Sequence, residues 1–187
     1  MNIDPVEHGA MDLIAQHAER KIFTPIEKPA LGDPLAFAYD VQDRFINHFL
    51  NKSGASIAGY KIGLTTPRMQ AFAGIPHPIA GVICSDRILY TPAELDSRNF
   101  GRLGLECEVA VRISKAIDGS SRLLQRSDVQ ACIGAVAPAF EIIDDRNADY
   151  SCLDSISLVA DNSWNAGIVL GELAGLPEIG NLDGRLA

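Results

Sequence analysis

The sequence predicts an α+β fold in which helices come first and short strands follow. Apolar side chains recur every three to four residues in the first 50 positions, and at every second residue further along. Helices and strands do not alternate regularly, which disfavours a doubly wound sheet. The chain has 187 residues, 47% hydrophobic and 21% charged. We therefore expect it to bury a core without disulfides or a structural metal.

Two N-terminal helices are predicted. Residues 10–20 carry apolar side chains at helical spacing. A connector that contains Pro and Gly follows at residues 24–32. Asp33 is then expected to cap a second helix, with Pro34 in its first turn. We therefore expect residues 1–55 to form an N-terminal helical segment.

Strands are predicted from short apolar runs that Gly, Pro and Asp separate. They fall at residues 57–64, 81–90, 105–113, 137–143 and 156–160. Two short helices are expected between them, one opened by Thr66 and Pro67 and one by Ser127 and Asp128. The sequence contains no internal repeat and no low-complexity tract.

Composition and charge disfavour several classes of partner. The chain has 16 Lys+Arg against 24 Asp+Glu, a net charge of −8, and no basic block. Nucleic acid and anionic membranes are therefore disfavoured as partners. The first residues lack the basic and apolar regions of a secretory signal, and no run approaches the roughly 18 apolar residues of a transmembrane helix. We expect a cytoplasmic protein.

The cysteines and histidines are scattered along the chain. No two cysteines form a Cys-x-x-Cys pair, and no histidine belongs to a His-Glu-x-x-His array. Zinc sites are therefore disfavoured. A Gly-x-Ser-x-Gly elbow, a Walker loop and a Gly-x-Gly-x-x-Gly fingerprint are also absent from the sequence. The thiols expected to be reduced and buried among apolar neighbours are Cys84, Cys107, Cys132 and Cys152.

The strand predicted at residues 105–113 carries two glutamates. A repeat of two residues places Glu106 and Glu108 on one face as near neighbours, with apolar side chains on the other face. Taken alone, this strand fits a solvated charged face that Arg112 balances.

A third glutamate, Glu141, lies inside the apolar run at residues 137–143. An unpaired buried carboxylate is strongly penalised, so Glu141 either points outward or meets a cation. If the two strands are neighbours, Glu106, Glu108 and Glu141 form an all-oxygen site. Such a site suits Mg²⁺ or Mn²⁺ better than Zn²⁺.

Lys61 lies between Gly59 and Gly63, which permit close approach of the backbone. Without other evidence, a surface lysine on an edge strand explains the pattern. Beside a metal-bound oxo acid, a lysine could instead bind the carboxylate of the acid or move a proton.

Five segments of the chain carry a family resemblance: GYKIGLT, Pro78-x-x-Gly81, GLECEVAVRI, APAFEIIDDR and LVADNSWNAGIVLG. They resemble segments of the 2-keto-4-pentenoate hydratase branch of the fumarylacetoacetate hydrolase superfamily, in the same order and at about the same separations. The AYDVQ of the second helix also resembles the N-terminal helical segment of that branch. The resemblance covers roughly residues 35–171.

The resemblance implies a metal-dependent hydro-lyase of aromatic-compound catabolism. Glu106, Glu108 and Glu141 match its metal ligands, and Lys61 matches its catalytic lysine. The implied reaction adds water to a 2-hydroxy-2,4-dienoate or 2-oxo-enoate and gives a 4-hydroxy-2-oxo acid, with Mg²⁺ or Mn²⁺ as cofactor. Two alternatives stay open: a 2-oxo-3-enedioate decarboxylase on the same scaffold, and a non-catalytic relative.

The chain departs from the family pattern at two positions. Ile79 stands where hydratases often have an acidic residue, and Trp164 follows the Asp-Asn pair where small hydroxyl residues are common. Core packing explains Trp164 as well as a role in the pocket does, and a loop-bracing ion pair explains Asp161 equally well. The candidates for substrate binding are Ile79, Asp161, Trp164 and Asn165.

The resemblance also implies that residues 56–187 form a catalytic domain built as a mixed β-roll. Relatives continue through further strands, so we expect the roll to be incomplete at its C-terminus. An unpaired sheet edge is a ready surface for another chain. We therefore expect a homo-oligomer, with a small 2-oxo or 2-hydroxy-dienoic acid as the ligand.

Overall fold

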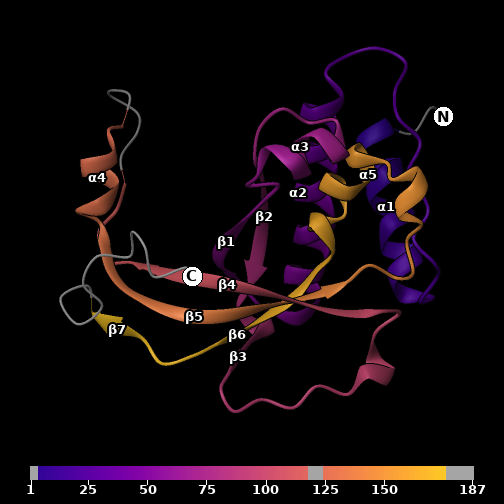
Figure 1. Cartoon of the computed structure of the whole chain (residues 1–187). Helices are drawn as coiled ribbons and strands as arrows, with labels where there is room; N and C mark the ends of the chain where they lie inside the picture. Colours follow the sequence, from indigo (N-terminus) through magenta and orange to yellow (C-terminus); the bar gives the residue numbers. More distant parts are fainter. Residues whose placement is uncertain (1–3, 118–123, 176–187) are drawn as a thin grey trace.

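The computed structural model describes residues 4–117 and 124–175. Most helices gather on one side of a sheet whose two long strands cross beneath them, and one short helix lies at the far end of these strands (Figure 1). Among the described residues, no helix is long and apolar enough to cross a membrane. The helices are α1 (Pro5–Ala18), α2 (Pro34–Ser53), α3 (Pro67–Ala73), α4 (Arg126–Gln130) and α5 (Ser155–Ala160).

The two predicted N-terminal helices are confirmed. The Asp33 side chain accepts hydrogen bonds from backbone N–H groups in the first turn of α2, and Pro34 occupies its first position. Gly54 ends the helix in the left-handed conformation, at φ 73°. Helix α1 begins earlier than predicted, at Pro5, because Asp4 caps it.

Helices α1 and α2 share one core with α5 and with strand β2 (Ile79–Cys84). Two hydrogen bonds fix α5 to the N-terminal part of the chain. Gln42 Nε2 donates to the Val159 carbonyl at 2.7 Å, and the Ile26 N–H donates to Ser157 Oγ at 3.0 Å. The most deeply buried side chains of this core are Leu13, Ala38, Val41, Val159 and Ala160.

The strands form two sheets. Strand β1 (Ile57–Gly63) pairs with β2 in an antiparallel two-stranded sheet. The larger sheet has the order β3-β6-β5-β4, and β7 pairs with a further part of β5. Its longest ladder runs antiparallel between β4 and β5. The bounds are β3 (Ile88–Tyr90), β4 (Leu103–Ile113), β5 (Ile133–Asp144), β6 (Asn165–Leu170) and β7 (Ala174–Gly175).

Two predictions about the strands are wrong, and one strand was missed. Residues 156–160 belong to a helix, because Asp154 caps it by accepting from the Ser157 N–H; a short apolar run does not distinguish a buried helix from a strand. The run at 81–90 is divided between β2 and β3 by a turn at Ser85–Arg87. Strand β6 was not predicted, although its sequence lies inside the last family segment.

Both faces of β4 are exposed: Glu106 and Glu108 are exposed as expected, and the opposite, apolar face is exposed as well. Its apolar residues are open: Leu105 is 54% exposed and Val109 is 51% exposed, and Phe140 of β5 lies on the same face at 44%. The glutamates lie on the opposite face. Cys107, on the open face, and Cys152 are exposed, so the expectation that all four thiols are buried is wrong for these two. No other described strand pairs with the outer edge of β4.

Candidate metal centre

Three carboxylates converge where β4 and β5 pair. Glu106 lies directly opposite Glu141 in the ladder, and Glu108 follows two residues later on the same face. One oxygen of each of Glu106, Glu108 and Glu141 lies within 4.8 Å of those of the other two. The structure therefore brings together the three predicted metal ligands, two of them exposed and Glu141 buried.

Lys61 reaches this cluster from the second sheet. Its Nζ lies 2.8 Å from Glu141 Oε1, with only 10% and 5% of the two side chains exposed. Asn165, the first residue of β6, donates from Nδ2 to the same oxygen at 2.8 Å. Burial of the Glu141 carboxylate is therefore compensated by one charge and one amide donor.

A glycine and an asparagine hold Lys61 over the sheet. Gly81 lies opposite Lys61 in the β1–β2 ladder. A Cβ there would come within 3.0 Å of Lys61 Cγ and 2.9 Å of Asn162 Oδ1. Asn162 exchanges two hydrogen bonds with the Val82 backbone, at 2.7 and 2.9 Å. The Gly of the Pro-x-x-Gly segment thus provides the space through which the lysine stem passes.

The chain around Asn162 is strained. Asn162, Ser163 and Trp164 all have positive φ, at 52°, 50° and 59°. Such a conformation costs of order 1–3 kcal/mol for each residue and is concentrated at functional sites. Here it allows Asn162 to hold β2 while Asn165, three residues later, reaches Glu141.

The charges of the cluster repel one another. Burial, and then the charges of Glu141 and Glu106, raise the pKa of Glu108, and the charge of Lys61 opposes this rise. Three carboxylates beside one lysine leave an excess negative charge of about two. A divalent cation compensates this charge.

The geometry fits a small oxygen-preferring ion. With Mg–O distances of about 2.1 Å, two ligand oxygens on one ion lie at most about 4.2 Å apart. The three ligand oxygens all lie within 4.8 Å of one another, so at most small rotations of the exposed Glu106 and Glu108 side chains would be needed to reach that value. The donor set contains neither nitrogen nor sulfur, which suits Mg²⁺, Mn²⁺ or Ca²⁺ better than Zn²⁺.

The four residues predicted to bind substrate lie in different surroundings. Asn165 contacts the carboxylate cluster through Glu141. Ile79 is buried in the helical core. Trp164 packs in a second apolar cluster with Phe23, and its Nε1 has no hydrogen-bond partner among the described residues. Asp161 is fully buried between the Arg146 guanidinium and the His17 imidazole, described next.

A buried ion network braces the end of α1 against this region. Asp161 lies 2.8 Å from the Arg146 guanidinium and 2.7 Å from His17 Nε2. Gln16 Oε1 accepts from Arg146 at 3.3 Å. Sequence reasoning proposed loop bracing for Asp161 but did not find His17 or Asn162. Both lie far from their partners in sequence, and no local spacing indicates such contacts.

The fold and the site together define a class of protein. It is an α+β protein whose sheet carries three carboxylates that could hold a divalent cation, with one lysine in contact with the buried carboxylate. No family model matches the chain. Individual curated proteins and solved structures nevertheless match it.

The most informative curated relatives are decarboxylases and hydratases of oxo acids. The chain is 29% identical over 155 residues to the 4-oxalocrotonate decarboxylase of Pseudomonas sp, covering 79% of this chain and 59% of that protein. It is 32% identical over 142 residues to the 2-oxo-hept-4-ene-1,7-dioate hydratase of Escherichia coli, covering 72% and 51%. It is 27% identical over 168 residues to the 2-hydroxypent-2,4-dienoate hydratase of Pseudomonas putida, covering 89% and 73%.

A solved structure agrees with these relatives. The 4-oxalocrotonate decarboxylase from Pseudomonas putida G7, complexed with magnesium and adipate, matches at a TM-score of 0.82 and 26% identity, over 95% of this chain and 66% of that one. A second structure of that enzyme, complexed with calcium and acetate, matches at a TM-score of 0.77. The α+β fold and the resemblance to the hydratase and decarboxylase branch are thereby confirmed. The chain spans 59% and 51% of the first two curated relatives.

Proposed function

We propose that this chain is a metal-dependent hydro-lyase that adds water to a 2-hydroxy-2,4-dienoate and gives a 4-hydroxy-2-oxo acid. The observation that carries this proposal is the contact of Lys61 Nζ with Glu141 in the cluster of three carboxylates. Hydratases among the relatives support the reaction class. Magnesium in a similar structure supports Mg²⁺ as the cofactor, with Mn²⁺ as an alternative.

Each residue of the site has a task in this proposal. Glu106, Glu108 and Glu141 would hold the ion, which when bound stabilises negative charge developing on substrate oxygen. Lys61 binds the substrate carboxylate or moves a proton from Nζ, directly or through water. Asn165 positions Glu141 through its Nδ2 hydrogen bond.

Decarboxylation of a 2-oxo-3-enedioate is the second candidate. It is favoured by the name of the first relative and of the matching structure, both 4-oxalocrotonate decarboxylases. The same carboxylates and lysine would serve it, because loss of CO₂ also leaves negative charge on the 2-oxygen. Among the four candidate substrate residues, Ile79, Asp161 and Trp164 stay predictions for either reaction.

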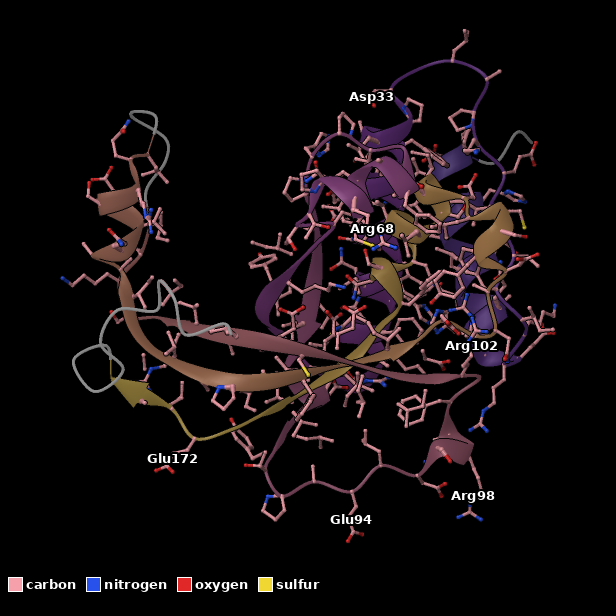
Figure 2. All side chains as sticks on the ribbon, in the orientation of Figure 1. Asp33, Arg68, Glu94, Arg98, Arg102 and Glu172 are labelled. Atoms are coloured by element: carbon pink, nitrogen blue, oxygen red, sulfur yellow. The ribbon has the colours of Figure 1, made fainter. Side chains whose placement is uncertain are left out.

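The test follows the ultraviolet absorbance of a 2-hydroxy-2,4-dienoate with Mg²⁺ and with EDTA. Glu106→Gln should abolish a metal-dependent loss of absorbance. The matched control is Glu94→Gln, since Glu94 lies on the connection between β3 and β4 and points away from the sheet (Figure 2). A reaction that EDTA does not inhibit, or no reaction, contradicts the proposal. Release of CO₂ from a dicarboxylate without a hydrated product assigns the decarboxylase.

We also propose that the chain forms a homo-oligomer through β4. Its outer edge has no described partner strand, and its open face is apolar. Light scattering should find a mass above that of one chain, and Val109→Lys on the open face should lower it. Val129→Lys, at an exposed position of α4, is the matched control. A monomer at all concentrations contradicts this proposal.

The finer features of the fold remain predictions. They are a roll of the fumarylacetoacetate hydrolase type, the division into residues 1–55 and 56–187, and the absence of C-terminal strands that relatives have. Residues 176–187 lie outside the described part of the chain. Placement in the cytoplasm is likewise a prediction, which fractionation of cells that produce the full protein would test.

A further inference from the structure

A cavity lies between the C-terminal ends of α1 and α2 and the start of β6. Its volume is about 510 Å³, within the roughly 300–1,000 Å³ of small-molecule sites. Neither the three glutamates nor Lys61 lines it. Asn165 does line it, and the same residue donates to Glu141, so the two sites share one wall.

The inner walls of this cavity are largely aromatic. Phe45 and Trp164 are buried, and Phe49 and Phe100 are half-buried beside them. Aromatic side chains offer flat apolar surface against which a planar ligand body can pack. The cavity therefore has room and surface for an unsaturated or aromatic group.

The mouth of the cavity is cationic. Arg20, Lys52 and Arg87 are exposed lining residues, and none has an ion pair with another residue of 4–117 or 124–175. Further inside, Arg146 is buried and its Nε has no hydrogen-bond partner among these residues. A buried donor without a partner costs free energy that a ligand acceptor could recover.

Two acidic residues line the same cavity, and one of them already accepts hydrogen bonds from the backbone. Asp144 Oδ1 accepts backbone N–H groups of Gly101, Arg102 and Arg146 at 3.0, 3.1 and 3.2 Å. The other acidic residue, Asp86, is exposed. Arg146 is already paired with Asp161, so the three cations at the mouth, Arg20, Lys52 and Arg87, face the carboxylates of Asp86 and Asp144. This balance favours an anion over a cation as the ligand.

We propose that this cavity binds a small organic anion, a carboxylate joined to a planar apolar body. The planar body packs among Phe45, Phe49 and Trp164, and the carboxylate faces Lys52 and Arg87 at the mouth. Neither the metal ligands nor Lys61 line this cavity, so the proposal goes beyond the proposed function. It assigns Trp164, predicted above to bind the substrate, to this other ligand instead. A ligand in this cavity contacts Asn165, which donates a hydrogen bond to the buried carboxylate of Glu141. Binding of the ligand is therefore coupled to the orientation of Glu141 in the metal centre.

The test compares cinnamate with cinnamamide, which has the same shape and no charge, by titration calorimetry in EDTA. Cinnamate should bind at least 10-fold more tightly than the amide. Trp164 is the single tryptophan of the chain, so its emission should change as cinnamate binds. Equal affinities for acid and amide, or no binding of cinnamate up to millimolar concentration, would overturn the proposal.

Two variants separate this cavity from other cationic surfaces. Lys52→Met with Arg87→Met should weaken cinnamate binding at least 5-fold. Lys21→Met with Arg98→Met changes the charge equally at exposed positions that do not line the cavity, and should leave it unchanged. Circular dichroism verifies that both variants fold. Equal effects of the two double variants, or loss of binding in Glu106→Gln, would assign the ligand elsewhere and overturn the proposal.

Discussion

Replacement of Lys61 by methionine tests the electrostatic account of the site. The substitution retains the apolar stem and removes the charge 2.8 Å from Glu141 Oε1. At an effective dielectric constant of about 20, two unit charges at that separation attract by about 6 kcal/mol. The variant also avoids the cost of burying the Lys61 ammonium group, and this gain offsets part of the lost attraction. We therefore expect a loss of about 3 kcal/mol in the free energy of unfolding, at the lower end for a broken buried pair.

The assay is urea unfolding with EDTA and with saturating Mg²⁺. With a slope of about 2 kcal/mol per M, the midpoint of Lys61→Met in EDTA should fall by about 1.5 M. Mg²⁺ should restore part of the loss because it compensates the same carboxylates.

Lys21→Met is the matched control. Lys21 pairs with Glu19 at 2.9 Å, but both side chains are more than half exposed. Such pairs contribute about 0–1 kcal/mol. If Lys61→Met and Lys21→Met unfold at the same urea concentration, or if Mg²⁺ leaves the Lys61→Met midpoint unmoved, the account of the buried site is refuted.

Three further outcomes are expected. The pKa of Glu108 is raised above its ordinary value of 4.5, so in EDTA its contribution to stability is full below about pH 4.5 and is lost as the pH rises through the raised pKa. Urea unfolding of wild type and Glu108→Gln should therefore differ in pH dependence, and parallel curves would contradict the expectation. Gly81→Ala should lower activity at least 10-fold, because its Cβ would lie 2.9 Å from Asn162 Oδ1; Gly59→Ala, with nothing within 4 Å, should retain activity, and equal effects would refute the reasoning. Cys107 should react quickly with a thiol reagent in dilute protein and more slowly as chains associate, whereas a rate independent of protein concentration would exclude β4 from the interface.

Part of the carboxylate site could be predicted from the sequence because strand geometry is local. A repeat of two residues places Glu106 and Glu108 on one face whatever the rest of the chain does. The position of Glu141 opposite Glu106 depends on the register of β4 against β5, which long-range pairing decides. The family resemblance supplied what the spacing did not.

Other features could not be predicted for physical reasons. Alternation places the apolar side chains of β4 on one face but does not show whether another element packs against that face; in the described residues Leu105 and Val109 stay 54% and 51% exposed. The strand predicted at residues 156–160 is a helix because the Asp154 cap favours one, and the apolar run fits either structure. Periodicity also gives no sign of contacts such as His17 with Asp161, which are 144 positions apart.

The position of α5 in the core has a consequence for synthesis of the chain. Helix α2 ends at Ser53 and α5 begins at Ser155, so about 100 residues must be made between them. At ~5–20 residues per second, this takes on the order of 5–20 s. During that interval the nascent α1–α2 hairpin exposes the apolar surface that Val159 and Ala160 later cover. On the ribosome this apolar surface is therefore open to chaperones that hold exposed apolar segments, until α5 emerges.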